Sequence, residues 1–522
     1  MQKTVRYARG VVTAPHHLAS QAGLSVLQEG GTAADAAVAV AATLAVVYPH
    51  MTGIGGDSFW LVSEPDGTIH AVHGCGGAAQ AATLERYAGY DAIPTRGLLA
   101  ANTVAGTISA WEAMLSASLL PLDRVLRDAI HHAQSGVPVT RSGADIVATK
   151  GTELAAQPGD WSAIYGEVRK GDLLYQPALA RTLRTLAAEG LRSFYTGSVG
   201  AAIAADFAEL GGLVTADDLA AHRAERPEPL HRRIDGARLY NSAPPTQGFA
   251  SLMILALYDR ITATAADGFD HVHRLVEATK SAFMIRDDVV GDPRYMPGYV
   301  NLQAMLDHNG WLEQRTSAID LERALPWPRP ASAGDTCWFA VADAEGRVVS
   351  AIQSVYFEFG SGVTLPRTGI TWQNRGSSFR LAPDGWNALM PGRKPFHTLN
   401  PALAEFTDGR IMAYGTMGGE GQPQTQAAIF TRYAHHGVEL QDAITRPRWL
   451  LGRTWGEASV TLKIEDRFPP PLIEQLRAAG HDVEVVGGFS QMMGHAGAIV
   501  LHPDGSYEGA TDPRSDGAVA GW

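Results

Sequence analysis

Thr336 is the residue of this chain whose type and position could supply a nucleophile. It follows Asp335 and precedes residues 337–342, an apolar, aromatic and β-branched run that predicts a strand. A Pro-rich loop, residues 326–333, leads into the junction, and residues 320–335 are expected to form an exposed linker. Threonine is common in strands, so this could be an ordinary strand residue. It could also be the nucleophile of a hydrolase that cuts its own chain, and this stretch alone leaves both interpretations open.

A predicted hairpin sets a second hydroxyl residue beside Thr336. After the turn at residues 343–347, a second strand is expected from residue 348 to about residue 356. A hairpin that is symmetric about Glu345 places Ser354 opposite Thr336.

Two glycine-rich loops and one arginine are further candidates for binding. Residues 415–421 follow a predicted strand and open a predicted helix, a geometry that presents backbone N–H groups to an anion. Because the loop lacks the lysine of a nucleotide-binding loop, an oxyanion hole is its better use. Residues 53–57 precede a strand and are expected to form a structural turn. Arg375, in a Gly/Ser-rich segment, is either a surface residue or an anion clamp.

Composition narrows the class of protein. The 522 residues are 45% hydrophobic and 18% charged, with a net charge of −12 and no basic stripe, so nucleic acid is not an expected partner. The two cysteines, Cys75 and Cys337, fit a reducing compartment. The apolar run 33–48 is short for a membrane span and contains Asp35. Since the first residues do not form a secretory signal either, we expect a cytoplasmic protein. The pairs His16–His17 and His131–His132 lack metal-ligand spacing, so neither a metal nor a cofactor is expected.

The order of predicted elements places these residues in a layered fold. Helical patterns dominate the first part of the chain, notably at 15–29, 33–47, 141–230 and 271–287. After residue 335 strands prevail, at 337–342, 348–356, 369–373, 410–415, 459–464, 483–486 and 496–501, with helices at 422–436 and 470–479. This order suggests stacked sheets covered by helices, as two domains or one large unit.

Blocks along nearly the whole chain resemble, in the same order, the γ-glutamyltransferase superfamily of N-terminal-nucleophile (Ntn) hydrolases. The blocks are residues 30–39, 47–59, 194–197, 211–219, 244–248, 277–293, 335–346, 415–419 and 512–517. The resemblance implies an α+β fold, a four-layer αββα sandwich, and a precursor that cuts itself between Asp335 and Thr336. Residues 1–335 would form the larger piece and residues 336–522 the smaller. The cut would free the α-amine of Thr336, whose pKa of roughly 8 suits it to act as the base for its own hydroxyl.

The same resemblance implies roles for individual residues. Gly418 and Gly419 match the pair that forms the oxyanion hole, and Ser354 matches the hydroxyl residue beside the nucleophile. The remaining matches, expected to bind substrate, are Arg375, Tyr356, Ser378, His397 and Thr398.

Departures from the family pattern argue against a γ-glutamyl substrate. Ser378 stands where γ-glutamyl enzymes hold the substrate amine with an aspartate, and Tyr356 stands where they have an asparagine. No arginine stands at residues 82–84, where one should grip the α-carboxylate. The bulky Trp338, Tyr356 and Trp372 are expected to narrow the pocket. We therefore expect hydrolysis of a small acid amide whose carboxylate Arg375 binds.

Residues 14–20, 46–51 and 356–362 look most like the branch of the superfamily that hydrolyses oxamate to oxalate and ammonia, a step in recovering nitrogen from purines and allantoin. Two alternatives stay open. One is a γ-glutamyl hydrolase/transferase or a cephalosporin-type acylase with an altered clamp. The other is an uncut, non-enzymatic binding protein, against which the retained Thr336, Ser354, Gly418 and Gly419 argue. The expected partners are a small-molecule amide and the chain's own two pieces, as a heterodimer or a dimer of heterodimers, with no nucleic acid and no membrane.

Overall fold

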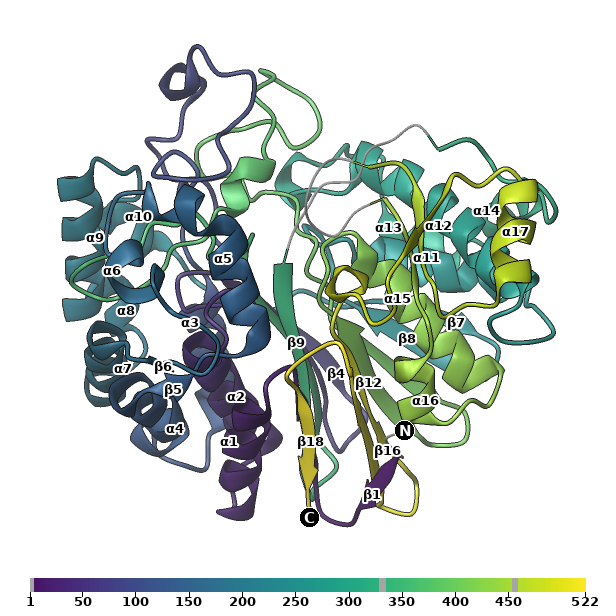
Figure 1. The fold of residues 1–522 in the computed structure, drawn as a ribbon, viewed down its shortest axis with the longest axis horizontal. Coiled ribbons are helices and arrows are strands. Elements are labelled where there is room, and N and C mark those ends of the chain that lie inside the picture. Colours follow the sequence, from purple (N-terminus) through teal and green to yellow (C-terminus); the bar gives the residue numbers. More distant parts are fainter. Residues whose placement is uncertain (1–3, 328–334, 453–458) are drawn as a thin grey trace.

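Two antiparallel sheets lie face to face between two helical layers (Figure 1). The computed structural model describes residues 4–327, 335–452 and 459–522. The six-stranded sheet has the order β18 (Ala518–Gly521), β2 (Val11–Ala14), β9 (Asp335–Ala342), β10 (Val348–Tyr356), β3 (Asp57–Ser63), β4 (Ile69–Gly74). The seven-stranded sheet has the order β1 (Val5–Tyr7), β17 (Tyr507–Thr511), β16 (Ala496–Leu501), β12 (Ile411–Thr416), β11 (Ala402–Phe406), β8 (Ala237–Asn241), β7 (Leu230–Ile234).

The helices divide between the two outer layers. On the left of Figure 1, over the six-stranded sheet, lie α1 (His17–Gln28), α2 (Ala33–Val47), α3 (Thr107–Met114), α4 (Leu122–Ser135), α5 (Arg141–Ala155), α6 (Trp161–Tyr165), α7 (Pro177–Glu189), α8 (Ser193–Thr196), α9 (Ser198–Leu210) and α10 (Ala216–Ala221). On the right lie α11 (Gly248–Tyr258), α12 (Phe269–Val289), α13 (Leu302–Asp307), α14 (Asn309–Ser317), α15 (Gly421–Phe430), α16 (Leu440–Thr445) and α17 (Pro470–Ala478). Two small sheets complete the described part, β5 (Val137–Pro138) with β6 (Leu173–Leu174), and β13 (Trp449–Leu451) with β14 (Leu462–Glu465) and β15 (Val483–Val486).

Strand β9 shows how alternation builds the layers. Cys337, Phe339 and Val341 face the core beneath the first helical layer. Trp338 and Ala340 face the core between the two sheets. Because successive side chains of a strand point to opposite faces, Thr336 lies on the same face as Trp338, toward the other sheet.

The αββα sandwich and most of the expected elements are confirmed. Helix α2 begins and ends where its apolar pattern predicts, with Thr32 and Asp35 forming a capping box. The strand expected at residues 369–373 is wrong, because this segment forms only isolated bridges at Thr371 and Trp372. The segment expected as strand 459–464 instead contributes the later strand β14, Leu462–Glu465.

Segments before and after the 335/336 junction alternate within both sheets. β9 and β10 lie between β2 and β3, and β11 pairs with β8. The first strand, β1, pairs with β17 near the other end of the chain. The described residues on the two sides of the junction are therefore joined by backbone ladders as well as by side-chain packing.

Candidate active site

Thr336 lies at the end of the inter-sheet space that also holds the loop after β12. At the opposite end, the hydroxyl of Tyr507 donates to the carbonyl of Asp343 at 2.6 Å, and Tyr507 is level with Leu501 and Ile411 in the neighbouring strands. Further along, the Trp338 ring fills the space above Gly415, where an added Cβ would lie 2.3 Å from the ring. Following β9 from Asp343 past Trp338 and β12 from Ile411 past Gly415, Thr336 comes toward residues 416–419.

The Thr336 hydroxyl is buried and forms no hydrogen bond with the described residues. The residue is 1% exposed, and its Oγ1 has no hydrogen-bond partner among the described residues. Buried hydroxyls usually have a partner, and a catalytic role is one explanation for a hydroxyl that lacks one.

The predicted hairpin register holds up to the residue next to the nucleophile. Cys337 pairs with Gln353, as symmetry about Glu345 requires, and the register then shifts, so that Tyr356 pairs with Asp335. The resulting bulge places Ser354 beside the start of β9, and its Oγ accepts from the Tyr356 amide at 2.7 Å. Tyr356 takes a φ of 83°, which is unusual for a bulky residue. The bulge thus redirects the Tyr356 side chain toward Arg375.

Gly418 and Gly419 form a turn whose amides are available to a ligand. Their φ values are 120° and 50°, and both residues are buried. Neither amide donates a hydrogen bond to any described group, although both lie just before the N-terminus of α15. Two buried, unused N–H donors at a helix start are suited to stabilise an oxyanion.

Arg375 is a buried cation with no ion-pair partner in the part of the chain that the structure describes. It is 1% exposed, its guanidinium carbon lies 3.7 Å from the Tyr356 ring centroid, and its two terminal nitrogens lie 3.5 and 3.4 Å from the Thr398 hydroxyl. In the described ranges no Asp or Glu forms an ion pair with it, and burial lowers its pKa to about 10. A buried charge needs a counterion, so this site is suited to bind an anion.

Asp57 and His397 lie behind Arg375, and sequence reasoning gave Asp57 no role in the site. Asp57 Oδ1 accepts from the Gly106 amide at 2.9 Å and from Gln373 Nε2 at 3.1 Å, and its Oδ2 lies 3.1 Å from His397 Nε2. Burial raises the Asp57 pKa to about 7, while the charge of Arg375 acts in the opposite direction. Burial holds the His397 pKa well below its usual range. This buried pair faces a cation without forming an ion pair with it.

One glutamine joins the oxyanion turn to the segment beside Arg375. Gln247 Nε2 donates to the Thr398 carbonyl at 2.7 Å and to the Gly419 carbonyl at 2.8 Å. Its Oε1 accepts from Arg286 at 2.9 Å, and Arg286 forms a 3.0 Å ion pair with Glu420. All the groups of this brace are buried. Gln247 lies in the 244–248 block quoted above, but its role depends on residues far away in the sequence.

Of the other residues expected in the pocket, Ser378 remains a candidate, whereas Trp338 and Trp372 lie elsewhere. The Ser378 hydroxyl is buried and has no partner in the described part of the chain, so it remains a candidate for substrate contact. The expectation that Trp338 and Trp372 narrow the pocket is wrong, because Trp338 packs between the sheets and Trp372 packs against Phe194 in the outer core. Only Tyr356 of that group contacts Arg375.

The comparisons with known proteins agree with this geometry. The family model described as "Gamma-glutamyltranspeptidase" matches residues 19–522. The chain is 54% identical to the oxamate amidohydrolase proenzyme of Klebsiella pneumoniae, over 98% of each chain. It is 41% identical to a glutathione hydrolase-like proenzyme of Bacillus subtilis over the full length of both. The crystal structure of cephalosporin acylase from Bacillus halodurans superposes with a TM-score of 0.92 at 33% identity, covering 100% of this chain and 97% of that one.

Proposed function

Because this chain belongs to the γ-glutamyltranspeptidase family, we propose that it cuts itself between Asp335 and Thr336 and then hydrolyses a small acid amide, oxamate. The products are oxalate and ammonia. The observation that carries the choice of an acid substrate is that Arg375 is buried and forms no ion pair with an Asp or Glu of the described residues.

In the self-cleavage step, Thr336 Oγ adds to the carbonyl carbon of Asp335 and the peptide C–N bond breaks. The resulting ester is hydrolysed by water, which leaves an α-carboxylate on Asp335 and a free α-amine on Thr336. Residues 1–335 and 336–522 remain together as a heterodimer, since β9 and β10 are paired on both sides with strands of the larger piece.

In the catalytic step, Arg375 binds the substrate carboxylate and the α-amine of Thr336 accepts the proton of its own hydroxyl. The oxygen attacks the amide carbon, and the amides of Gly418 and Gly419 stabilise the oxyanion. As the tetrahedral intermediate collapses, the amide nitrogen takes the proton from the α-ammonium, the C–N bond breaks, and the nitrogen leaves as ammonia. Water then hydrolyses the acyl ester, releases the diacid and restores Thr336.

A γ-glutamyl substrate is the second candidate, favoured by the 41% identity to a glutathione hydrolase-like relative. Ammonia release from oxamate, measured beside the release of aniline from a γ-glutamyl anilide, separates the two substrates. We expect turnover of oxamate and little of the anilide. Strong turnover of the anilide without ammonia release from oxamate would overturn the oxamate assignment.

We place the protein in the cytoplasm. Cys75 and Cys337 are both buried and are not joined in a disulfide, which fits a reducing compartment. Among the described residues, the structure contains no helix of the length and apolarity that crossing a membrane requires.

A further inference from the structure

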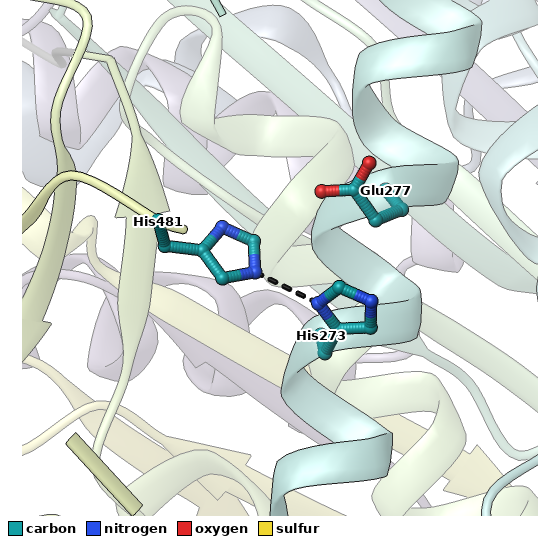
Figure 2. Close-up of side chains that lie close together, drawn as sticks. All are labelled: His273, Glu277 and His481. Atoms are coloured by element: carbon teal, nitrogen blue, oxygen red, sulfur yellow. Dashed lines mark hydrogen bonds between the residues drawn. The ribbon is translucent and has the colours of Figure 1, made fainter. Parts of the chain in front are cut away.

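A buried polar cluster outside the active site holds the segment that leads to the 335/336 junction. It comprises His273, Glu277 and Lys280 on α12, and His481 just after α17. Figure 2 shows His273, Glu277 and His481. The four residues are between 0% and 6% exposed. Such a set must have partners for its charges and lone pairs.

The partners are backbone groups of the segment between α14 and the Pro-rich residues 326–333. His273 Nε2 lies 2.9 Å from the Asp320 carbonyl, to which it donates. Glu277 Oε2 accepts from the Leu325 amide at 3.1 Å, and Lys280 Nζ donates to the Leu325 carbonyl at 2.5 Å. The Leu325 side chain is itself 47% exposed, so backbone bonds rather than side-chain burial fix this residue.

The geometry is that of a hydrogen-bonded clamp rather than a metal centre. His273 Nδ1 and His481 Nε2 are 2.8 Å apart (Figure 2), whereas two imidazoles on one tetrahedral zinc, with Zn–N of about 2.0–2.1 Å, would be separated by about 3.3 Å. Glu277 already forms a 2.7 Å ion pair with Lys280, whose ammonium would repel a cation. His481 instead joins α12 to the chain after α17, where Ala479 also accepts from the Ala324 amide at 2.8 Å.

We infer that this cluster is the upstream anchor of the self-cleavage reaction. The inference rests on the proposed cut between Asp335 and Thr336. The two residues of that bond begin β9, which is fixed within the six-stranded sheet. Upstream, the nearest residue whose N–H and C=O are both held by the cluster is Leu325. With the chain held at Leu325 and again from the start of β9, the bond to be cut samples fewer orientations relative to the Thr336 hydroxyl. After the cut, the same bonds retain the C-terminal part of the larger piece on the enzyme.

The test is the rate of self-cleavage in a variant without the ion pair, Glu277→Leu/Lys280→Met. Replacing both members leaves no unpaired buried charge, a change that is often neutral for stability. The control is Arg274→Met, which removes a cation from the same helix that holds the 261–262 carbonyls and Asp270 instead. Each precursor is made by cell-free translation, and its cleavage is followed on denaturing gels.

We expect self-cleavage of the double variant to slow about 10-fold, within the range of up to roughly 100-fold that a 1 Å misplacement of reacting groups costs. Arg274→Met should match wild type, and matured double variant should keep wild-type kcat. Equal cleavage rates for wild type and double variant would overturn the inference. An uncut wild type would instead overturn the proposed function.

A second measurement does not depend on cleavage. In a Thr336→Ala background, trypsin should cut after the exposed Arg323 faster in the double variant than in its parent. Equal tryptic rates would show that the cluster does not hold the segment.

Discussion

Removing the Arg375 guanidinium should abolish preference for a substrate that carries a carboxylate. In Arg375→Ala the substrate carboxylate would be buried without a partner, and the contacts with Tyr356 and Thr398 would be lost as well. Removing one partner of a buried charged pair costs about 2–4 kcal/mol, which corresponds to a fall in kcat/KM of roughly 30- to 1,000-fold.

The assay compares ammonia release from oxamate and from oxamide, in which an amide replaces the carboxylate. Arg375→Ala should lose kcat/KM on oxamate and change little on oxamide, so the ratio of the two reports the carboxylate contact directly. Arg380→Ala is the matched control, since this exposed arginine lies five residues further along and packs on Trp386. Equal losses on both substrates would refute a carboxylate-binding role for Arg375.

Three further predictions address other parts of the site. Gln247→Leu should lower kcat about 10-fold with little change in KM, because the turn that holds the oxyanion donors loses its brace. The loss should stay below the roughly 100-fold or more that removing a direct donor costs, since the Gly418 and Gly419 amides remain. Steady-state kinetics on oxamate measure this change, and Gln176→Leu, which removes a buried amide elsewhere, is the control. Asp57 has a raised pKa of about 7, so the folded state binds its proton more tightly than the unfolded state does. As the pH rises from about 4 to about 7, the free energy of unfolding of the uncut Thr336→Ala chain should therefore fall relative to that of the same chain carrying Asp57→Asn. Denaturant unfolding at each pH measures both free energies. A difference between the two chains that stays constant over this pH range would contradict the raised pKa. Thr336→Ser should be cut and active, whereas Thr336→Ala should be uncut and inactive, as judged by denaturing gels and ammonia release.

The sequence of a single hairpin was enough to predict that Ser354 lies beside the nucleophile Thr336. The Ser354 prediction follows from a symmetric turn and the period-2 geometry of strands, and the observed register agrees up to Gln353. The bulge that follows depends on a third strand, because Ser354 also pairs with Asp57 and Gly56 leaves room for the Ser354 carbonyl. No feature within the hairpin reports that constraint.

Long-range contacts explain what sequence reasoning missed. The sequence of residues 53–57 is explained by a Gly-rich turn alone. Nothing in that sequence therefore indicated that Asp57 is buried against His397. Gln247 likewise becomes informative only when α11 lies beside the 398 and 419 carbonyls. Trp338 and Trp372 were misassigned to the pocket because bulk in a sequence does not report which of several cores a side chain fills.

The central claim is that Thr336 becomes the N-terminal nucleophile of the mature protein. Intact-mass spectrometry of the purified wild-type protein tests it most directly. We predict two polypeptides, residues 1–335 and residues 336–522, the smaller of which begins with an unmodified threonine. A single species of 522 residues, or a cut at any other bond, would contradict it.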